Sequence, residues 1–438
     1  MNNSVLTYRN EAMKEEYYKL THKSGLTVLV YPKALSTAYV MFTTKYGSLE
    51  RTFRREGEDF ITVPDGVAHF LEHKLFEEAD GSDAFEKFAP LGASANAFTS
   101  FEMTSYLFST TDRLDEALAV LLDFVTHPYF TEENVAKEQG IIAQEIGMGL
   151  DNPGNRLYYS LLEGLYRNHN IRVEIAGTEK SIAEITPEIL YRCYETFYQL
   201  SNMVLVVCGN TTVEDVMRTV DAILPQEAVA CSIECKYPEE DERIARPYTE
   251  LRMSVATPLF AFGVKDTRTF STPEERVRYA LLADILSKCY FSRSADFYNR
   301  LYDEGLIVKD IGCYYESFAS CAYLMITGES EKPDEVYAVT KNLLQNISRN
   351  LPTEQDFERI KRVIYADYIR TFDNTEALAM ALTDCHLRGT EFLSEGNVIN
   401  ALSYSEFVHF ATTFFDGKEF ALSVIYPSAS EKKEKEEN

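Results

Sequence analysis

Basic residues are scarce in this sequence. Its 438 residues include 43 lysines and arginines against 69 aspartates and glutamates, which gives a formal net charge of −26. A negative surplus of this size opposes binding to the phosphates of nucleic acids and to anionic membrane surfaces, so neither is expected as a partner. Basic peptides are compatible with the charge as ligands, although the same charge can serve solubility alone.

Long apolar runs and paired cysteines are also missing. No stretch approaches the roughly 18 apolar residues of a membrane-spanning helix, and Met1–Lys23 lacks the apolar segment of a signal peptide. The eight cysteines are scattered, and the one close pair, Cys231 and Cys235, has no second pair or histidine near it in sequence to complete a zinc site. We therefore expect free thiols in a cytoplasmic protein without a membrane anchor.

Tryptophan is absent, but 28 tyrosines and 27 phenylalanines are typical of a well-packed globular protein. The chain is too long for one ordinary hydrophobic core, and residues 353–367 resemble residues 131–145, so the second half reads as a diverged copy of the first. We expect an N-terminal half over 1–230, a linker over 231–250, a homologous C-terminal half over 251–427 and a disordered tail over 428–438. Hydrophobic patterns predict strands at 25–31, 37–46, 93–100, 104–109 and 203–208 and helices at 82–88, 114–126, 131–152 and 156–166.

Histidine is rare as well, with 7 residues in the chain, yet two of them lie four positions apart. Residues 65–76 read as a helix, so His69 and His73 project from one face, with Glu72 beside them. Two histidines at this spacing can hold one divalent metal, and the carboxylate can take a proton from water. The order H-x-x-E-H is the inverzincin signature, but it arises by chance in about one such sequence in a hundred, so a third ligand is needed.

The predicted helix over 131–152 offers two candidates for that third ligand. Glu138 and Glu145 are seven residues apart, hence two turns apart on one face. Either carboxylate could reach the metal while the other holds a histidine N–H. Surface glutamates at heptad spacing are the alternative, and the spacing alone favours that alternative.

Taken together, the H-x-x-E-H motif and Glu138-x6-Glu145 resemble the pitrilysin/insulinase, or inverzincin, metallopeptidases. Residues 95–100 and 104–106, Asp151-Asn152-Pro153 and Ala176-Gly177-Thr178 match further landmarks of that family, so the resemblance covers roughly residues 25–427. It implies an α+β fold of two homologous halves, each a mostly antiparallel sheet packed with helices, that form a half-chamber. The metal motif would belong to the N-terminal half only.

The resemblance also implies the roles of the site residues. One Zn²⁺ per chain would be held by His69, His73 and Glu145. Glu72 would be the general base, and Glu138, also counted with the catalytic residues, would sit behind the histidines.

Substrate contacts are implied for four further residues. Asn96, Ala97 and Phe98 would lie on a strand that pairs with an extended peptide, although the residues alone favour an ordinary edge strand. Single-chain relatives bring an arginine and a tyrosine from the second half to the substrate carbonyl. Arg300 matches that arginine, but Ile307 stands at the tyrosine position and has no hydrogen to donate. Because losing such a donor costs about 2.7–4 kcal/mol, we expect the chain to pair with a homologous, motif-less subunit that supplies the Arg/Tyr pair, or to form a homodimer.

The implied function is that of a zinc-dependent endopeptidase. It would cleave oligopeptides or leader peptides within a closing chamber, as the catalytic subunit of a heterodimer. The alternative is an accessory or scaffold subunit that supports a peptide- or protein-modification pathway with little peptidase activity of its own. The chain is most similar to the paired peptidases of Gram-positive bacteria, a subgroup linked to the modification of elongation factor P.

Overall fold

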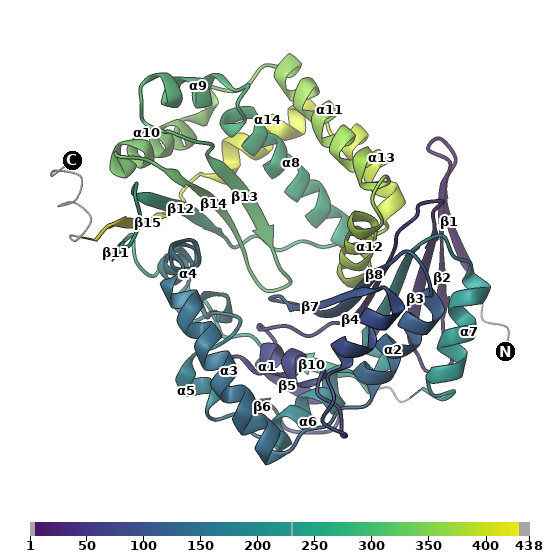
Figure 1. The fold of residues 1–438 in the computed structure, drawn as a ribbon. Helices are drawn as coiled ribbons and strands as arrows, with labels where there is room; N and C mark the ends of the chain where they lie inside the picture. Colours follow the sequence, from purple (N-terminus) through teal and green to yellow (C-terminus); the bar gives the residue numbers. More distant parts are fainter. Residues whose placement is uncertain (1–4, 229–230, 429–438) are drawn as a thin grey trace. The chain divides into compact units, whose positions relative to one another are not determined.

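The computed structural model describes residues 5–228 and 231–428, which form two compact units (Figure 1). Each unit contains a sheet packed with helices, so the predicted α+β fold of two such halves is confirmed. The units exchange segments of the chain. The first comprises Met1–Ile146, Glu174–Tyr237 and Tyr368–Glu395, and the second comprises Gly147–Val173, Pro238–Asp367 and Gly396–Asn438. Residues 147–173 of the predicted N-terminal half thus belong to the second unit, and residues 368–395 of the predicted C-terminal half belong to the first.

The first unit is built on a seven-stranded sheet in which one neighbouring pair, β3 and β9, is parallel. Its strands, in spatial order, are β1 (Leu6–Asn10), β2 (Glu15–Thr21), β3 (Thr27–Pro32), β9 (Met203–Gly209), β4 (Ala38–Thr44), β8 (Thr104–Thr110) and β7 (Ser94–Thr99). Its helices are α1 (Val67–Lys74), α2 (Leu114–Thr126), α3 (Glu132–Asp151, which continues into the second unit), α5 (Glu179–Ile182), α6 (Pro187–Phe197), α7 (Val213–Ile223) and α12 (Thr375–Arg388).

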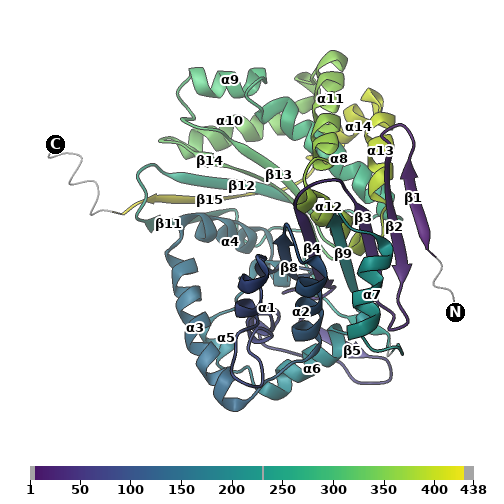
Figure 2. The same ribbon diagram turned by 45° about the vertical axis from the view of Figure 1, so that its right-hand side comes forward.

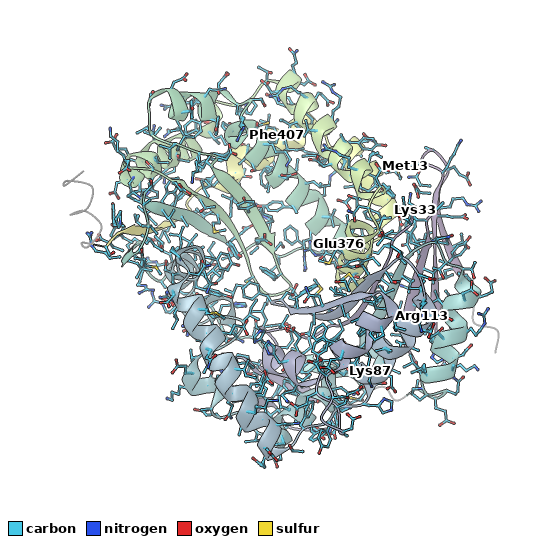
Figure 3. The ribbon with its side chains drawn as sticks, in the orientation of Figure 1. Met13, Lys33, Lys87, Arg113, Glu376 and Phe407 are labelled. Carbon is cyan, nitrogen blue, oxygen red and sulfur yellow. The ribbon has the colours of Figure 1, made fainter. Side chains whose placement is uncertain are left out.

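Strand β4 shows why the sheet is covered on both faces. All seven of its residues are buried, as expected for a central strand. Val40 and Phe42 point into the core that contains α1 and α2, whereas Met41 points the other way and contacts Thr383 of α12. Tyr39 also donates a hydrogen bond to Glu376 at the start of α12. Figure 3 labels Glu376 on this helix. The helix from the C-terminal half is therefore an integral layer of the first unit.

The second unit has a five-stranded sheet with one parallel pair, β11 and β15. In spatial order its strands are β11 (Tyr248–Met253), β15 (Phe420–Pro427), β12 (Leu259–Asp266), β14 (Ala322–Glu329) and β13 (Gly312–Ser317). Its helices are α4 (Pro153–Leu165), α8 (Pro273–Phe291), α9 (Asp296–Asp303), α10 (Pro333–Gln345), α11 (Glu354–Thr371, which ends in the first unit), α13 (Glu395–Ala401) and α14 (Tyr404–Phe414). Figure 2 shows α4 lying along the sheet, where it packs on β11, β12 and β15.

Several segments differ from the sequence-based expectation. The polar N-terminal stretch forms β1 and β2. The predicted linker contains the start of β11 and all of β10 (Ile233–Cys235), which joins a small sheet with β5 (Thr52–Arg55) and β6 (Ile61–Thr62). The predicted helix over 82–88 is a short 3₁₀ turn, Ala84–Lys87, capped by Asp83. The predicted disordered tail lies outside the described residues apart from Ser428.

Two other expectations concern cysteines and membranes. All eight cysteines fall within the described ranges and are free thiols. Within residues 5–228 and 231–428, no helix combines the length and the apolar character needed to cross a membrane.

Candidate metal centre

Helix α1 begins where two loops meet backbone to backbone. Gly66, just before the helix, has φ 92°, and a Cβ built on it would lie 2.5 Å from the carbonyl oxygen of Ala176. Reciprocally, Gly177 has φ 77°, and its Cβ would lie 2.6 Å from the carbonyl oxygen of Asp65. Because neither position has room for a side chain, the two glycines fix where α1 starts and how its histidines are aimed.

We expect Gly66→Ala to destabilise the protein by roughly 2–4 kcal/mol, because the new Cβ combines left-handed strain of about 1 kcal/mol with a backbone clash. Urea-induced unfolding measures this change. Gly57→Ala is the matched control, since Gly57 also has a left-handed φ, 82°, but has nothing within 4 Å of its Cβ. Equal losses in the two variants would contradict the clash.

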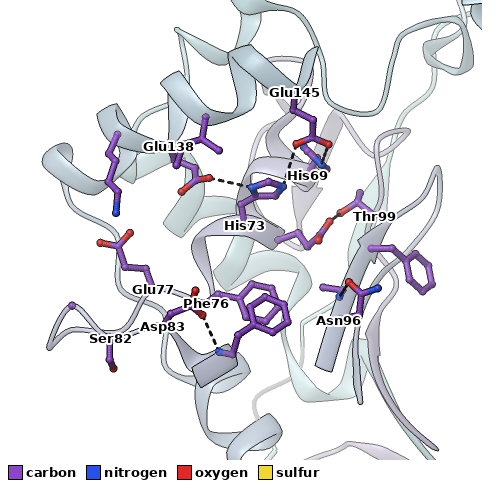
Figure 4. A pocket seen from close by; sticks show the side chains of 17 residues that line it. His69, His73, Phe76, Glu77, Ser82, Asp83, Asn96, Thr99, Glu138 and Glu145 are labelled. Atoms are coloured by element: carbon purple, nitrogen blue, oxygen red, sulfur yellow. Dashed lines mark hydrogen bonds and ion pairs between the residues drawn. The ribbon is translucent and has the colours of Figure 1, made fainter. Parts of the chain in front are cut away.

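Three side chains converge at the open side of α1 (Figure 4). The Nε2 atom of His69 lies 3.5 Å from Oε1 of Glu145, and the Nε2 atom of His73 lies 3.5 Å from Oε2 of the same carboxylate. One ligand atom from each residue falls within 4.8 Å of the others. Of the two glutamates that the sequence left open, Glu145 is therefore the one that faces both histidines.

This donor set fits zinc. Zinc at about 2.0–2.1 Å from nitrogen and oxygen donors in a tetrahedron places neighbouring donors roughly 3.3–3.4 Å apart, close to the two 3.5 Å separations. Two imidazoles and one carboxylate are also a ligand set of catalytic zinc sites, which leave the fourth position for water or substrate. The Nδ1 atom of His69 is buried without a hydrogen-bond partner among the described residues, so the ring is not engaged in a hydrogen-bond network on that side.

Glu138 contacts the other nitrogen of His73. Its Oε1 atom lies 3.1 Å from Nδ1, which leaves Nε2 of the ring directed at Glu145. Burial lowers the pKa of His73, but the hydrogen bond to Glu138 and the charges of the surrounding glutamates outweigh burial, so the pKa is raised. Burial raises the pKa of Glu138, and here the hydrogen bond from His73 and the Lys74 charge prevail and lower it. The hydrogen bond from His69 lowers the pKa of Glu145 below its usual range. Both carboxylates are thus held in the charged form that a cation requires.

Glu72 lies beside the three proposed ligands and is held by a hydrogen bond. It is buried, 7% exposed, and its Oε2 atom accepts a hydrogen bond of 2.7 Å from the Thr99 hydroxyl at the end of β7. Sequence reasoning missed Thr99, and the signal that could have found it is its place at the end of the strand singled out for substrate. It also assigned no role to Lys74, which the structure buries.

A cavity of about 710 Å³ opens over the three ligands. Glu72, Glu138, Phe76, Glu77 and Asp83 line it, together with residues of β7 and α3. Asn96, Ala97 and Phe98 belong to this lining, so the structure brings the predicted peptide strand to the predicted metal ligands. Because β7 is the last strand of its sheet, no strand of the described chain pairs with its outer edge.

Arg300 belongs to the other compact unit. It is an exposed residue of α9, and its guanidinium lies 5.1 Å from the centre of the Phe297 ring. Ile307, at the expected tyrosine position, is 2% exposed and packs in the core of the second unit.

Comparison with known proteins identifies the family. Residues 63–179 match the insulinase family, peptidase family M16, and residues 184–364 match the peptidase M16 inactive domain. An uncharacterized zinc protease of Bacillus subtilis strain 168, YmfH, is 38% identical over 377 residues, which cover 85% of this chain and 88% of that protein.

Solved structures agree with the sequence matches. A crystal structure from Alicyclobacillus acidocaldarius, described as an M16-like peptidase, aligns with a TM-score of 0.89 at 32% identity and covers 98% of this chain and 99% of that one. A protease from Helicobacter pylori shares the fold, with a TM-score of 0.80 at 19% identity over 94% of this chain and 100% of that one. The resemblance inferred from the motif is confirmed: the chain belongs to the insulinase family of peptidases, family M16.

Proposed function

We propose that this protein is a zinc-dependent endopeptidase that cleaves oligopeptides or precursor peptides. The observation that carries the proposal is the convergence of His69, His73 and Glu145, with Glu72 beside them, in a cavity bordered by a strand edge that no strand of the described chain pairs with. A purely structural metal site would be closed by a fourth protein ligand. Here the three proposed ligands face the cavity instead.

Each side chain has a defined task in this proposal. His69, His73 and Glu145 hold zinc, which when bound lowers the pKa of water and polarises a carbonyl group. Glu72 accepts a proton from the attacking water and passes it to the departing amine. The Thr99 hydroxyl orients Glu72, and Glu138 accepts the Nδ1 hydrogen of His73 so that Nε2 is free to bind the metal.

Strand β7 supplies the peptide-binding edge. An extended substrate that adds to its outer edge donates and accepts main-chain hydrogen bonds, which suits many sequences because the backbone is common to all peptides. Asn96, Ala97 and Phe98 then lie along the substrate next to the scissile bond. Arg300 remains a proposed substrate contact from the second unit.

Pairing with a homologous subunit is part of the proposal. Ile307 is buried and has no hydrogen to donate, so this chain does not itself offer a tyrosine at that position. A motif-less homologue that carries the Arg/Tyr pair would complete the site, and a homodimer is the second arrangement. We place the pair in the cytoplasm.

The test is cleavage of a defined mixture of unstructured peptides, followed by mass spectrometry, with zinc content measured on the same sample. We expect about one zinc per chain, cleavage that a chelator abolishes and that zinc restores, and faster cleavage after addition of a motif-less homologue. Bound zinc without cleavage, both in the absence and in the presence of the homologue, would instead support the accessory function. A chain that binds no zinc would overturn both the metal site and the activity.

Thr99→Val tests the orientation of the base. A hydrogen bond to a charged group is worth about 1.5–3 kcal/mol, so we expect kcat to fall roughly 10- to 100-fold while zinc content is unchanged. Thr99→Ser keeps the hydroxyl and is the matched control, with kcat near that of the wild type. Equal loss in both variants would show that the methyl group, and not the hydrogen bond, matters.

A further inference from the structure

Lys74 is the one fully buried cation of α1, directly after the second histidine of the motif. Its side chain is 0% exposed, and its Nζ atom donates a hydrogen bond of 2.5 Å to Oε2 of Glu77. The same Nζ atom lies 3.7 Å from Oε2 of Glu138. A buried ammonium costs several kcal/mol unless it is paired, so these two carboxylates explain why a lysine can occupy this position.

Glu138 lies between two nitrogen partners, one for each of its oxygens. Oε1 faces Nδ1 of His73 at 3.1 Å, and Oε2 faces Nζ of Lys74 at 3.7 Å. The carboxylate is only 11% exposed, so water has little access to replace either partner. With both oxygens engaged, the carboxylate cannot rotate away from the histidine without giving up the lysine.

We propose that Lys74 is a positioning residue of the zinc site, which holds Glu138 against His73. The inference rests on the proposed zinc site and adds to it a residue that is not itself a proposed metal ligand. Lys74 lies on the same helix as the two histidines, whereas Glu138 lies on α3. The ion pair between the Lys74 ammonium and Glu138 therefore also connects α1 to α3 beside the proposed ligands.

The ordinary explanation is that Lys74 merely neutralises Glu77. Glu77 is the nearer carboxylate, but it is 27% exposed and lines the cavity, so water can solvate it when the lysine is removed. Glu138 is more deeply buried and touches a ligand. The two explanations differ in what a lysine substitution does to zinc, because only the Glu138 contact leads to His73.

Three variants separate the explanations. Lys74→Met keeps the apolar stem and leaves both glutamates without the cation. The double variant Lys74→Met/Glu77→Gln removes the stranded charge of Glu77 as well, so it restores charge balance on the cavity side but not at Glu138. Glu77→Gln alone keeps Lys74 beside Glu138 and is the control.

The readouts are the zinc dissociation constant, from competition with a chelator, and urea unfolding of the zinc-free chains. Residues that orient a ligand typically contribute 10- to 100-fold to metal affinity. We expect this loss in Lys74→Met and in the double variant, and the double variant should regain the part of the zinc-free stability that the stranded charge of Glu77 costs Lys74→Met. Glu77→Gln should bind zinc within about threefold of the wild type.

Wild-type zinc affinity in the double variant would overturn the inference while leaving the zinc site intact. A loss of zinc affinity in Glu77→Gln as large as that in Lys74→Met would also overturn it, since the Glu77 contact would then carry the effect. If the wild type itself binds no zinc, the proposed function fails instead. The double variant keeps the test decisive if Lys74→Met alone does not fold.

Discussion

Glu72→Gln is expected to retain zinc and to lose about 10³-fold or more in kcat for peptide cleavage. Glutamine has nearly the same shape, and its amide oxygen can still accept the hydrogen bond from Thr99, so the cavity should keep its structure. It has no basic oxygen that takes a proton from water. General acid–base catalysis contributes about 10²–10⁴-fold, and the same carboxylate serves both attack and departure in our proposal. Zinc content and kcat measured on one preparation check this prediction.

The same substitution at Glu145 is the matched control. Glu145 lies 3.5 Å from each Nε2 atom, so Glu145→Gln replaces a charged ligand by a neutral one and should weaken zinc binding as well as activity. The contrast between the two glutamates is the sharp result: one variant keeps the metal, and the other does not. Unchanged cleavage in Glu72→Gln would remove the base role from the proposal.

The motif and the helices around it could be predicted because the residues that specify them are close together in the sequence. Helix α2 runs over the predicted residues 114–126, and α3 differs from its prediction by one residue at each end. Both carry amphipathic patterns that the sequence shows directly. The spacing of Glu138 and Glu145 placed them on one face but could not decide which one faces the histidines. That choice depends on how far along α3 the helix α1 crosses, which is a matter of tertiary packing.

Thr99 and Lys74 were beyond the reach of sequence patterns for the same reason. The hydroxyl of Thr99 matters because β7 ends next to Glu72, 27 positions away along the chain. Lys74 reads as a surface residue in any helical pattern, since lysine is almost never fully buried. Its burial follows from two glutamates, one of which lies on a different helix.

Charged side chains of the predicted linker have buried partners. Glu240 lies within the acidic stretch that read as linker, yet its carboxylate accepts hydrogen bonds from the backbone N–H groups of Arg167, Asn168 and His169. It also pairs at 2.7 Å with Nζ of Lys265, whose side chain is 4% exposed. Composition shows the charge of such a segment, but it does not show that Lys265 on β12 pairs with it.

Glu240→Gln is therefore expected to destabilise the protein by about 3–5 kcal/mol at pH 7, because it leaves Lys265 buried without its counter-charge. Urea unfolding measures the loss. Glu250→Gln is the matched control: its partner Arg252 is 58% exposed and Glu250 itself 38%, so that surface pair should contribute at most about 1 kcal/mol. Similar losses in the two variants would contradict the buried pair.

The pH dependence of this difference provides an independent check. Burial raises the pKa of Glu240, but the three N–H groups and Lys265 outweigh burial and lower the pKa to about 2. An unfolded glutamate has a pKa of about 4.3, so the stabilisation is fully present above that value and is lost as the pH falls towards 2. The stability difference between wild type and Glu240→Gln should accordingly be constant from pH 7 to about 5 and be about half as large at pH 3. Taking the difference between the two proteins cancels groups that titrate identically in both. His169 is not one of them: burial lowers its pKa to about 4, and the charge of Glu240 acts against that lowering. A difference that stays constant down to pH 3 would show that the charge of Glu240 is not what holds this segment in place.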